Sequence, residues 1–135
     1  MKANNRCYTY FTIVGDFDPV DIANRLGIEP CESWKKGDLR RNGSVYESSR
    51  WSCGRCDEYD ADVGNQLRKT IADLRGKTQE LAAIRKAFNA NFYLEIVPEL
   101  YVGEVNPCLA PPLDIIDFCH ETRTEIDIDM YLYSK

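Results

Sequence analysis

The segment most suggestive of chemistry is 51–56, Trp-Ser-Cys-Gly-Arg-Cys, in which two cysteines stand three positions apart. This spacing resembles a thioredoxin-type redox site, where a helix N-terminus stabilises the first thiolate. Four acidic residues follow within 57–62, and their charge would raise the pKa of a nearby thiol. A structural zinc ion needs four ligands, and no second pair of Cys or His with suitable spacing completes a tetrahedron. We therefore expect Cys53 and Cys56 to be free thiols near a turn.

Other catalytic patterns are incomplete. Gly76-Lys77-Thr78 resembles the end of a phosphate-binding loop, but the glycine required five residues earlier is replaced by Ile71. The sequence contains one histidine, His120, which leaves little for a Ser or Cys nucleophile that needs an imidazole base. We assign no catalytic, cofactor-binding or metal-binding residue, and we expect no cofactor.

Charge is distributed unevenly along the chain. Residues 34–55 contain six basic and two acidic side chains, a local charge of +4, so the rest of the chain carries −9 of the total of −5. Two tryptophans flank this basic segment, and exposed Trp together with Arg is typical of binding hot spots. The candidate partner-binding residues are Trp34, Lys36, Asp38, Arg40 and Trp51.

The alternative is that both tryptophans belong to the core and the charges form a solvated rim. We expect a split outcome, in which at least one indole is buried against residues 26–28 with its N–H bonded to backbone. Lys36, Asp38 and Arg40 should remain exposed at the turn.

Length and composition predict a single domain over residues 1–135, with 44% hydrophobic residues and enough chain to bury a core. The negative net charge argues against a function in binding nucleic acid or anionic lipid. No apolar run approaches the roughly 18 residues of a membrane helix, and the N-terminal segment is typical of a strand and not of a signal peptide. We expect a soluble cytoplasmic protein.

Periodicity predicts the secondary structure. Asp18 and Pro19 are typical of a helix start, Gly27 of a helix end, and Asn42-Gly43 of a hairpin turn. Strands are expected at 7–14, in a hairpin within 34–55, at 92–101 and at 125–133, and helices at 18–27, 62–76, 78–88 and 109–119.

The last strand should point Ile126, Ile128, Met130 and Leu132 inward and Asp127 and Asp129 outward, because side chains alternate along a strand. The order β-α-β-β-α-α-β-α-β predicts an α+β two-layer sandwich, with helices over one face of a largely antiparallel sheet. Its general architecture is akin to ferredoxin-like folds with an inserted helical pair.

Five segments spread along the chain carry a family resemblance: Gly15-Asp16-Phe17-Asp18-Pro19, Leu26-Gly27-Ile28-Glu29-Pro30, Trp34-Lys35-Lys36-Gly37-Asp38, Trp51-Ser52 and Glu125-Ile126-Asp127-Ile128-Asp129-Met130-Tyr131. With them the chain resembles the uncharacterised, mainly bacterial family called domain of unknown function 4279. The resemblance implies a single small α+β domain. The family has no established activity, so it implies no catalytic residues.

These observations leave three functional hypotheses. The first is a non-enzymatic interaction module, in which the Trp34 to Trp51 hairpin meets an acidic protein partner or a small anionic ligand; immunity and accessory proteins are analogies. The second is a small enzyme or ligand binder with an acidic cleft beside Asp127 and Asp129, which a cluster of carboxylates with raised pKa would favour. The third is a thiol or metal function at Cys53 and Cys56. The sequence predicts no oligomeric state.

Overall fold

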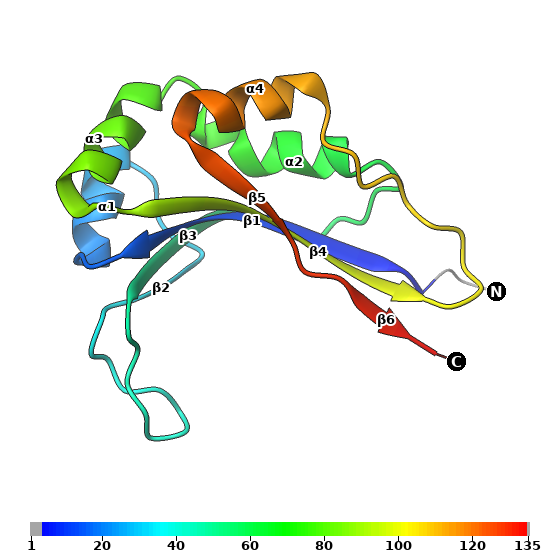
Figure 1. Cartoon of the computed structure of the whole chain (residues 1–135), viewed down its shortest axis with the longest axis horizontal. Coiled ribbons are helices and arrows are strands. Elements are labelled where there is room, and N and C mark those ends of the chain that lie inside the picture. Colours follow the sequence, from blue (N-terminus) through cyan, green and yellow to red (C-terminus); the bar gives the residue numbers. More distant parts are fainter. Residues whose placement is uncertain (1–3, 135) are drawn as a thin grey trace.

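A mixed β-sheet with helices along one face forms the body of the protein in a computed structural model, which describes residues 4–134 (Figure 1). The strands are β1 (Arg6–Gly15), β2 (Glu32–Trp34), β3 (Ser49–Cys56), β4 (Asn91–Tyr101), β5 (Thr124–Ile128) and β6 (Tyr131–Tyr133). The helices are α1 (Pro19–Leu26), α2 (Val63–Ile71), α3 (Thr78–Phe88) and α4 (Leu113–Thr122), with a 3₁₀ turn at Ala72–Leu74. The predicted α+β class is confirmed.

The strands lie in the order β2-β3-β1-β4-β5, and β6 also pairs with β4. β1, β2, β3 and β4 pair with antiparallel neighbours, whereas β5 and β6 run parallel to β4. Residues 4–134 therefore contain one strand more than the predicted order. The likeness to ferredoxin-like folds stays a prediction.

The extra strand arises because the predicted last strand is broken into β5 and β6. Between them, the backbone N–H of Asp129 donates to the carbonyl of Ile96. Ile126 packs against the core, but Ile128, Met130 and Leu132 are 46%, 46% and 69% exposed, so the predicted inward placement of these three was wrong. The helices end above β5, and β6 extends past them (Figure 1).

The helix boundaries follow the capping residues. The side chain of Asp18 caps α1 and Gly27 ends it in the left-handed conformation, as predicted. α4 begins at Leu113 and not at the predicted position 109, because each of Pro111 and Pro112 disfavours the helical conformation in the residue before it, and Pro112 itself is extended.

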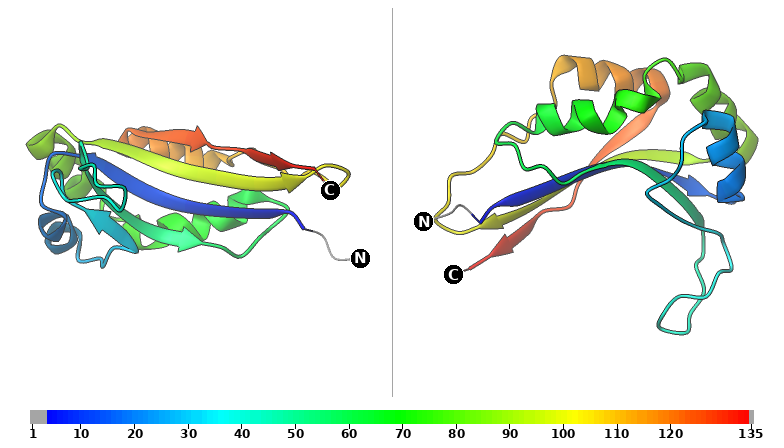
Figure 2. Two further views of the ribbon diagram at one scale, coloured as in Figure 1. Left: turned by 90° about the horizontal axis from the view of Figure 1, so that it is seen from below. Right: turned by 180° about the vertical axis from the view of Figure 1, so that it is seen from behind.

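The core lies between the helices and one face of the sheet, which the strands cover with residues such as Phe11, Ile13, Trp51 and Leu94. The opposite face carries no helix (Figure 2). We call it the open face. The loop between β2 and β3, residues 35–48, projects from the sheet on this side, so it stands beside the open face at one end (Figure 1).

Candidate functional site

The two tryptophans lie on opposite faces of the sheet. Ser33 pairs with Trp51 and Trp34 pairs with Arg50 across the antiparallel ladder of β2 and β3, so the two indoles alternate in direction. Trp51 is 0% exposed in the core, whereas Trp34 is half-buried on the open face. The expected split is confirmed. The expected indole bond to backbone was wrong, because Nε1 of Trp51 is buried in the core and has no hydrogen-bond partner among the described residues.

Trp34 belongs to a stack of four planar groups that joins the loop to the sheet. The Trp34 and Tyr46 rings are stacked, with centroids 4.2 Å apart and planes at 15°. The guanidinium of Arg40 lies 5.0 Å from the Tyr46 ring, and that of Arg50 lies 5.4 Å from the Trp34 ring. We call these four residues the arginine–aromatic stack. It contains two predicted site residues, Trp34 and Arg40, and two that the prediction did not single out.

Lys36 and Asp38 are exposed at the turn, as predicted, but they lie outside the stack. Asp38 accepts a hydrogen bond from the backbone N–H of Lys35, and the Lys36 ammonium lies 3.5 Å from the carboxylate of Asp16. These two side chains therefore shape the base of the loop, and nothing in the structure directs them toward a ligand shared with Trp34.

The Cys-x-x-Cys segment forms a β-bulge. The register of β1 and β3 shifts between the pairs Thr9–Cys56 and Phe11–Cys53, and Gly54 has a φ of +71°. This geometry is that of a bulge that needs glycine in the left-handed conformation. The extra residue keeps both cysteines buried and turns Arg55 outward onto the open face. Burial raises the pKa of Cys53 to about 12, so this thiol is poorly suited to act as a nucleophile or metal ligand.

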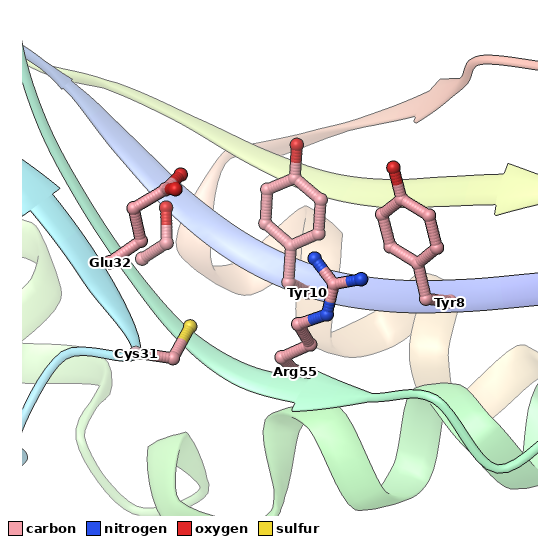
Figure 3. Close-up of a pocket in the computed structure, with 6 residues that line it drawn as sticks. Tyr8, Tyr10, Cys31, Glu32 and Arg55 are labelled. Atoms are coloured by element: carbon pink, nitrogen blue, oxygen red, sulfur yellow. The ribbon is translucent and has the colours of Figure 1, made fainter.

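Arg55 stacks on Tyr8 of β1, with its guanidinium 4.0 Å from the ring centroid. The Tyr8 and Tyr10 rings lie parallel, 6.2 Å apart, and Figure 3 shows both pointing away from β1 beside Arg55. A hollow of about 300 Å³ opens beside them. It is lined by Tyr8, Tyr10, Cys31, Glu32, Ser52 and Arg55.

A buried carboxyl lies next to this hollow. Glu95 of β4 pairs laterally with Tyr10 of β1 and with Asp127 of β5, and it is only 8% exposed. Burial raises the pKa of Glu95 to about 7, a hydrogen bond with Asp127 and its negative charge add to the rise, and Arg50 opposes it. The burial of Tyr10 itself and the negative charge of Glu95 raise the pKa of the Tyr10 hydroxyl.

Sequence reasoning therefore missed Tyr8, Tyr10, Tyr46 and Glu95 as possible site residues, and counted Arg50 and Arg55 only as part of a charged cluster. A glycine inside a strand pattern can indicate a bulge, so Gly54 could have placed Arg55 correctly. The sequence contains no signal for the burial of Glu95, a charged residue within β4.

Within 4–134, no three side chains of His, Cys, Asp or Glu lie close enough together to hold a metal ion. None of the helices in this range has the length and apolar character needed to span a membrane.

Fold and site together define a small α+β protein with an uncovered sheet face lined by arginine and aromatic side chains. The chain belongs to the family described as Domain of unknown function (DUF4279), whose model matches residues 5–133. Comparisons with curated proteins and with solved structures find no match.

Proposed function

We propose that this protein is a non-enzymatic binding module that docks an acidic segment of a partner protein against the arginine–aromatic stack. The observation that supports this most directly is the stack itself: Arg40, Tyr46, Trp34 and Arg50 hold one another on the open face. A role as an immunity or accessory protein stays a prediction.

The charges at the two ends of the stack are available to a partner. Within the described chain, neither Arg40 nor Arg50 forms an ion pair with a carboxylate, whereas Arg55 is held by Asp57. Guanidinium groups form strong, often bidentate hydrogen bonds with carboxylates. Arg40 would therefore offer charge-assisted hydrogen bonds to an acidic segment without first breaking an internal pair, whereas Arg50 already has a hydrogen bond with Tyr10 and an attraction to Glu95.

Stacking also reduces the entropic cost of binding. A free arginine side chain loses rotamer freedom when a partner immobilises it, at a cost of about 0.5 to 1.5 kcal/mol. Arg40 and Arg50 are already restrained by the rings of Tyr46 and Trp34. Trp, Tyr and Arg are also the residue types that contribute most to binding hot spots.

The test uses the two tryptophans as probe and internal control. We would label both indoles with fluorine and titrate the protein with an acetylated octaglutamate peptide at low salt, while recording the fluorine NMR spectrum. The Trp34 resonance should shift in a saturable manner and the Trp51 resonance should stay in place, because only Trp34 borders the open face.

The matched variants are Arg50→Gln and Lys86→Gln. Arg50→Gln should weaken binding at least tenfold, the loss expected for a hydrogen-bonded charge pair, whereas Lys86 is an exposed residue of α3 and its substitution should change nothing. An unmoved Trp34 resonance, or equal binding by both variants, would contradict the proposal.

A second candidate function rests on Glu95. A carboxyl with a pKa near 7 beside an exposed aspartate is one that can hold a proton at neutral pH and release it. The acidic-cleft hypothesis named Asp127 and Asp129; the structure brings Glu95 to Asp127, while Asp129 accepts a hydrogen bond from the Tyr131 hydroxyl. The test is the affinity of a small polar ligand for the neighbouring hollow, measured on both sides of pH 7. A change in affinity in the wild type that is absent in Glu95→Gln would favour this candidate.

A further inference from the structure

Most basic side chains of the open face lie on one side of β1 and most acidic ones on the other. The exceptions are Glu32 of β2, which lines the hollow beside Arg55, and Arg6 of β1, which forms an ion pair with Glu99. Arg40, Arg50 and Arg55 lie on the loop and β3, and the other acidic side chains lie on the other side of β1, on β4 and along β5 and β6. The acidic group consists of Glu95, Glu99, Asp127 and Asp129, which are linked to one another or to the surrounding tyrosines. The tyrosines of β1 stand between the two groups.

Apolar and aromatic groups mark the two ends of the same face. At the loop tip, Leu39 and Val45 form an isolated bridge and both are exposed. At the other end, Tyr131 and Tyr133 of β6 are exposed, and their hydroxyls donate to Asp129 and Glu99. Figure 1 shows the loop and β6 at opposite ends of the sheet, both reaching past the helix-covered body.

The protein also exposes more surface than a compact chain of its mass. Its accessible surface is 8191 Å², whereas a folded monomer of 15.5 kDa is expected to expose about 7,200 Å². The loop and β6 project from the body (Figure 1), and this projecting surface is available for a partner to cover.

We infer that the acidic partner is a second copy of this chain, bound through the open face about a two-fold axis. This inference rests on the proposed function, since it names the partner of the same stack. A two-fold interface uses the same surface on both copies, so that surface must complement itself. When two open faces meet about a two-fold axis that lies between them, perpendicular to the line from the loop to β6, the loop of each copy reaches β6 of the other.

The side chains at the two ends of the open face are suited to a contact between the loop of one copy and β6 of the other. Arg40 would face the Asp129 carboxylate of the other copy, and the apolar side chains of Leu39 and Val45 would cover the rings of Tyr131 and Tyr133. Every contact occurs twice, so each complementary pair contributes twice to the stability of the dimer. An acidic peptide that occupies the stack should compete with dimer formation.

The first measurement is the molar mass of the wild type by analytical ultracentrifugation at low ionic strength and about 0.1 mM protein. We expect twice the 15.5 kDa of the chain, and a shift toward the monomer when salt screens the charges. Octaglutamate should also dissociate the dimer. A wild type that stays monomeric at low salt would overturn the inference.

Charge reversal then tests the contact. Arg40→Glu and Asp129→Arg should each weaken the dimer at least tenfold, and an equimolar mixture of the two variants should recover it. In the mixed dimer one contact is the wild-type pair and the other is the same pair reversed. Lys86→Glu, on the helical side, is the control and should leave the dimer intact. Failure of the mixture to recover the dimer would contradict the two-fold contact.

The same series of variants distinguishes three outcomes: an unfolded variant, failure of the dimer and failure of the proposed function. Circular dichroism checks that each variant is folded, and Asp129→Lys, which reverses the same charge, replaces Asp129→Arg if the latter is not. The Asp129→Arg monomer retains the whole stack, so octaglutamate should still shift its Trp34 resonance. A monomeric wild type with a Trp34 response removes only the second copy, whereas an Asp129→Arg monomer without this response removes the proposed function.

Discussion

The two faces of β3 show how one strand serves two purposes. On the covered face, Trp51 and Cys53 are completely or almost completely buried and contribute to stability by excluding water. On the open face, Arg50 and Arg55 each lie over an aromatic ring, so they are ordered without being buried. The core is therefore held by packing and the candidate site by stacking, so a substitution in the candidate site should cost less stability than one in the core.

The largest effect is expected for Trp51. Truncation to Ala removes a fully buried indole and should lower the free energy of unfolding by about 3 to 5 kcal/mol, enough to unfold a marginal domain. Trp34→Ala should cost about 1 kcal/mol, because its ring is half-exposed. Urea denaturation followed by circular dichroism measures both. Equal losses would contradict the division between the two faces.

The next largest effect is expected at the bulge. A Cβ at Gly54 would lie 2.1 Å from the backbone oxygen of Thr70 in α2, and the positive φ adds strain. Gly54→Ala should therefore destabilise the protein by about 3 kcal/mol. Gly43 also has a positive φ, but no atom lies within 4 Å of the Cβ position, so Gly43→Ala should cost about 1 kcal/mol. Thermal unfolding of both variants checks the difference.

The predictable part of the fold comes from local signals. Asp18, Pro19 and Gly27 fix the first helix, and the alternation along 92–101 fixes β4. The break between β5 and β6 was not predictable, because the alternating pattern continues through Asp129 and Met130. What ends the buried stripe is the extent of the helical layer, which is a tertiary property.

The candidate site was predictable only in part for a related reason. The composition of 34–55 pointed to Trp34 and Arg40, but which face each tryptophan takes depends on strand register. A shift of one residue would exchange the two faces. Glu95 was hidden for another reason: its burial depends on neighbours from β1, β3 and β5 that are distant in sequence.

A smaller effect, dependent on pH, is expected for Glu95. Its pKa is about 7 in the folded state and 4.5 is its ordinary value. Between these values the unfolded chain has released a proton that the folded protein retains, so stability falls as the pH rises from about 4.5 to about 7. Above pH 7 the loss is complete and remains constant.

Glu95→Gln should remove this dependence. The variant should exceed the wild type in free energy of unfolding by about 1 to 3 kcal/mol at pH 8 and match it at pH 4. Urea titrations at a series of pH values measure the slope. Glu125→Gln, an exposed residue of the same sheet face, is the control and should leave the slope unchanged. An unchanged slope in Glu95→Gln would show that this carboxyl does not carry the raised pKa.

The smallest effect concerns the stack itself. A double-mutant cycle with Arg50→Gln and Trp34→Leu isolates the energy of the guanidinium on the indole, because the separate losses of each side chain cancel. We expect a coupling of about 0.5 to 1 kcal/mol, the value for a cation–π contact at a partly exposed site. The corresponding cycle with Arg40→Gln should give a coupling near zero, since Arg40 lies over Tyr46 and not over Trp34. If both cycles give the same coupling, the two arginines act on Trp34 through the loop as a whole and not by direct stacking. The order of the open face would then depend on the order of the loop, as the order of the covered face depends on packing.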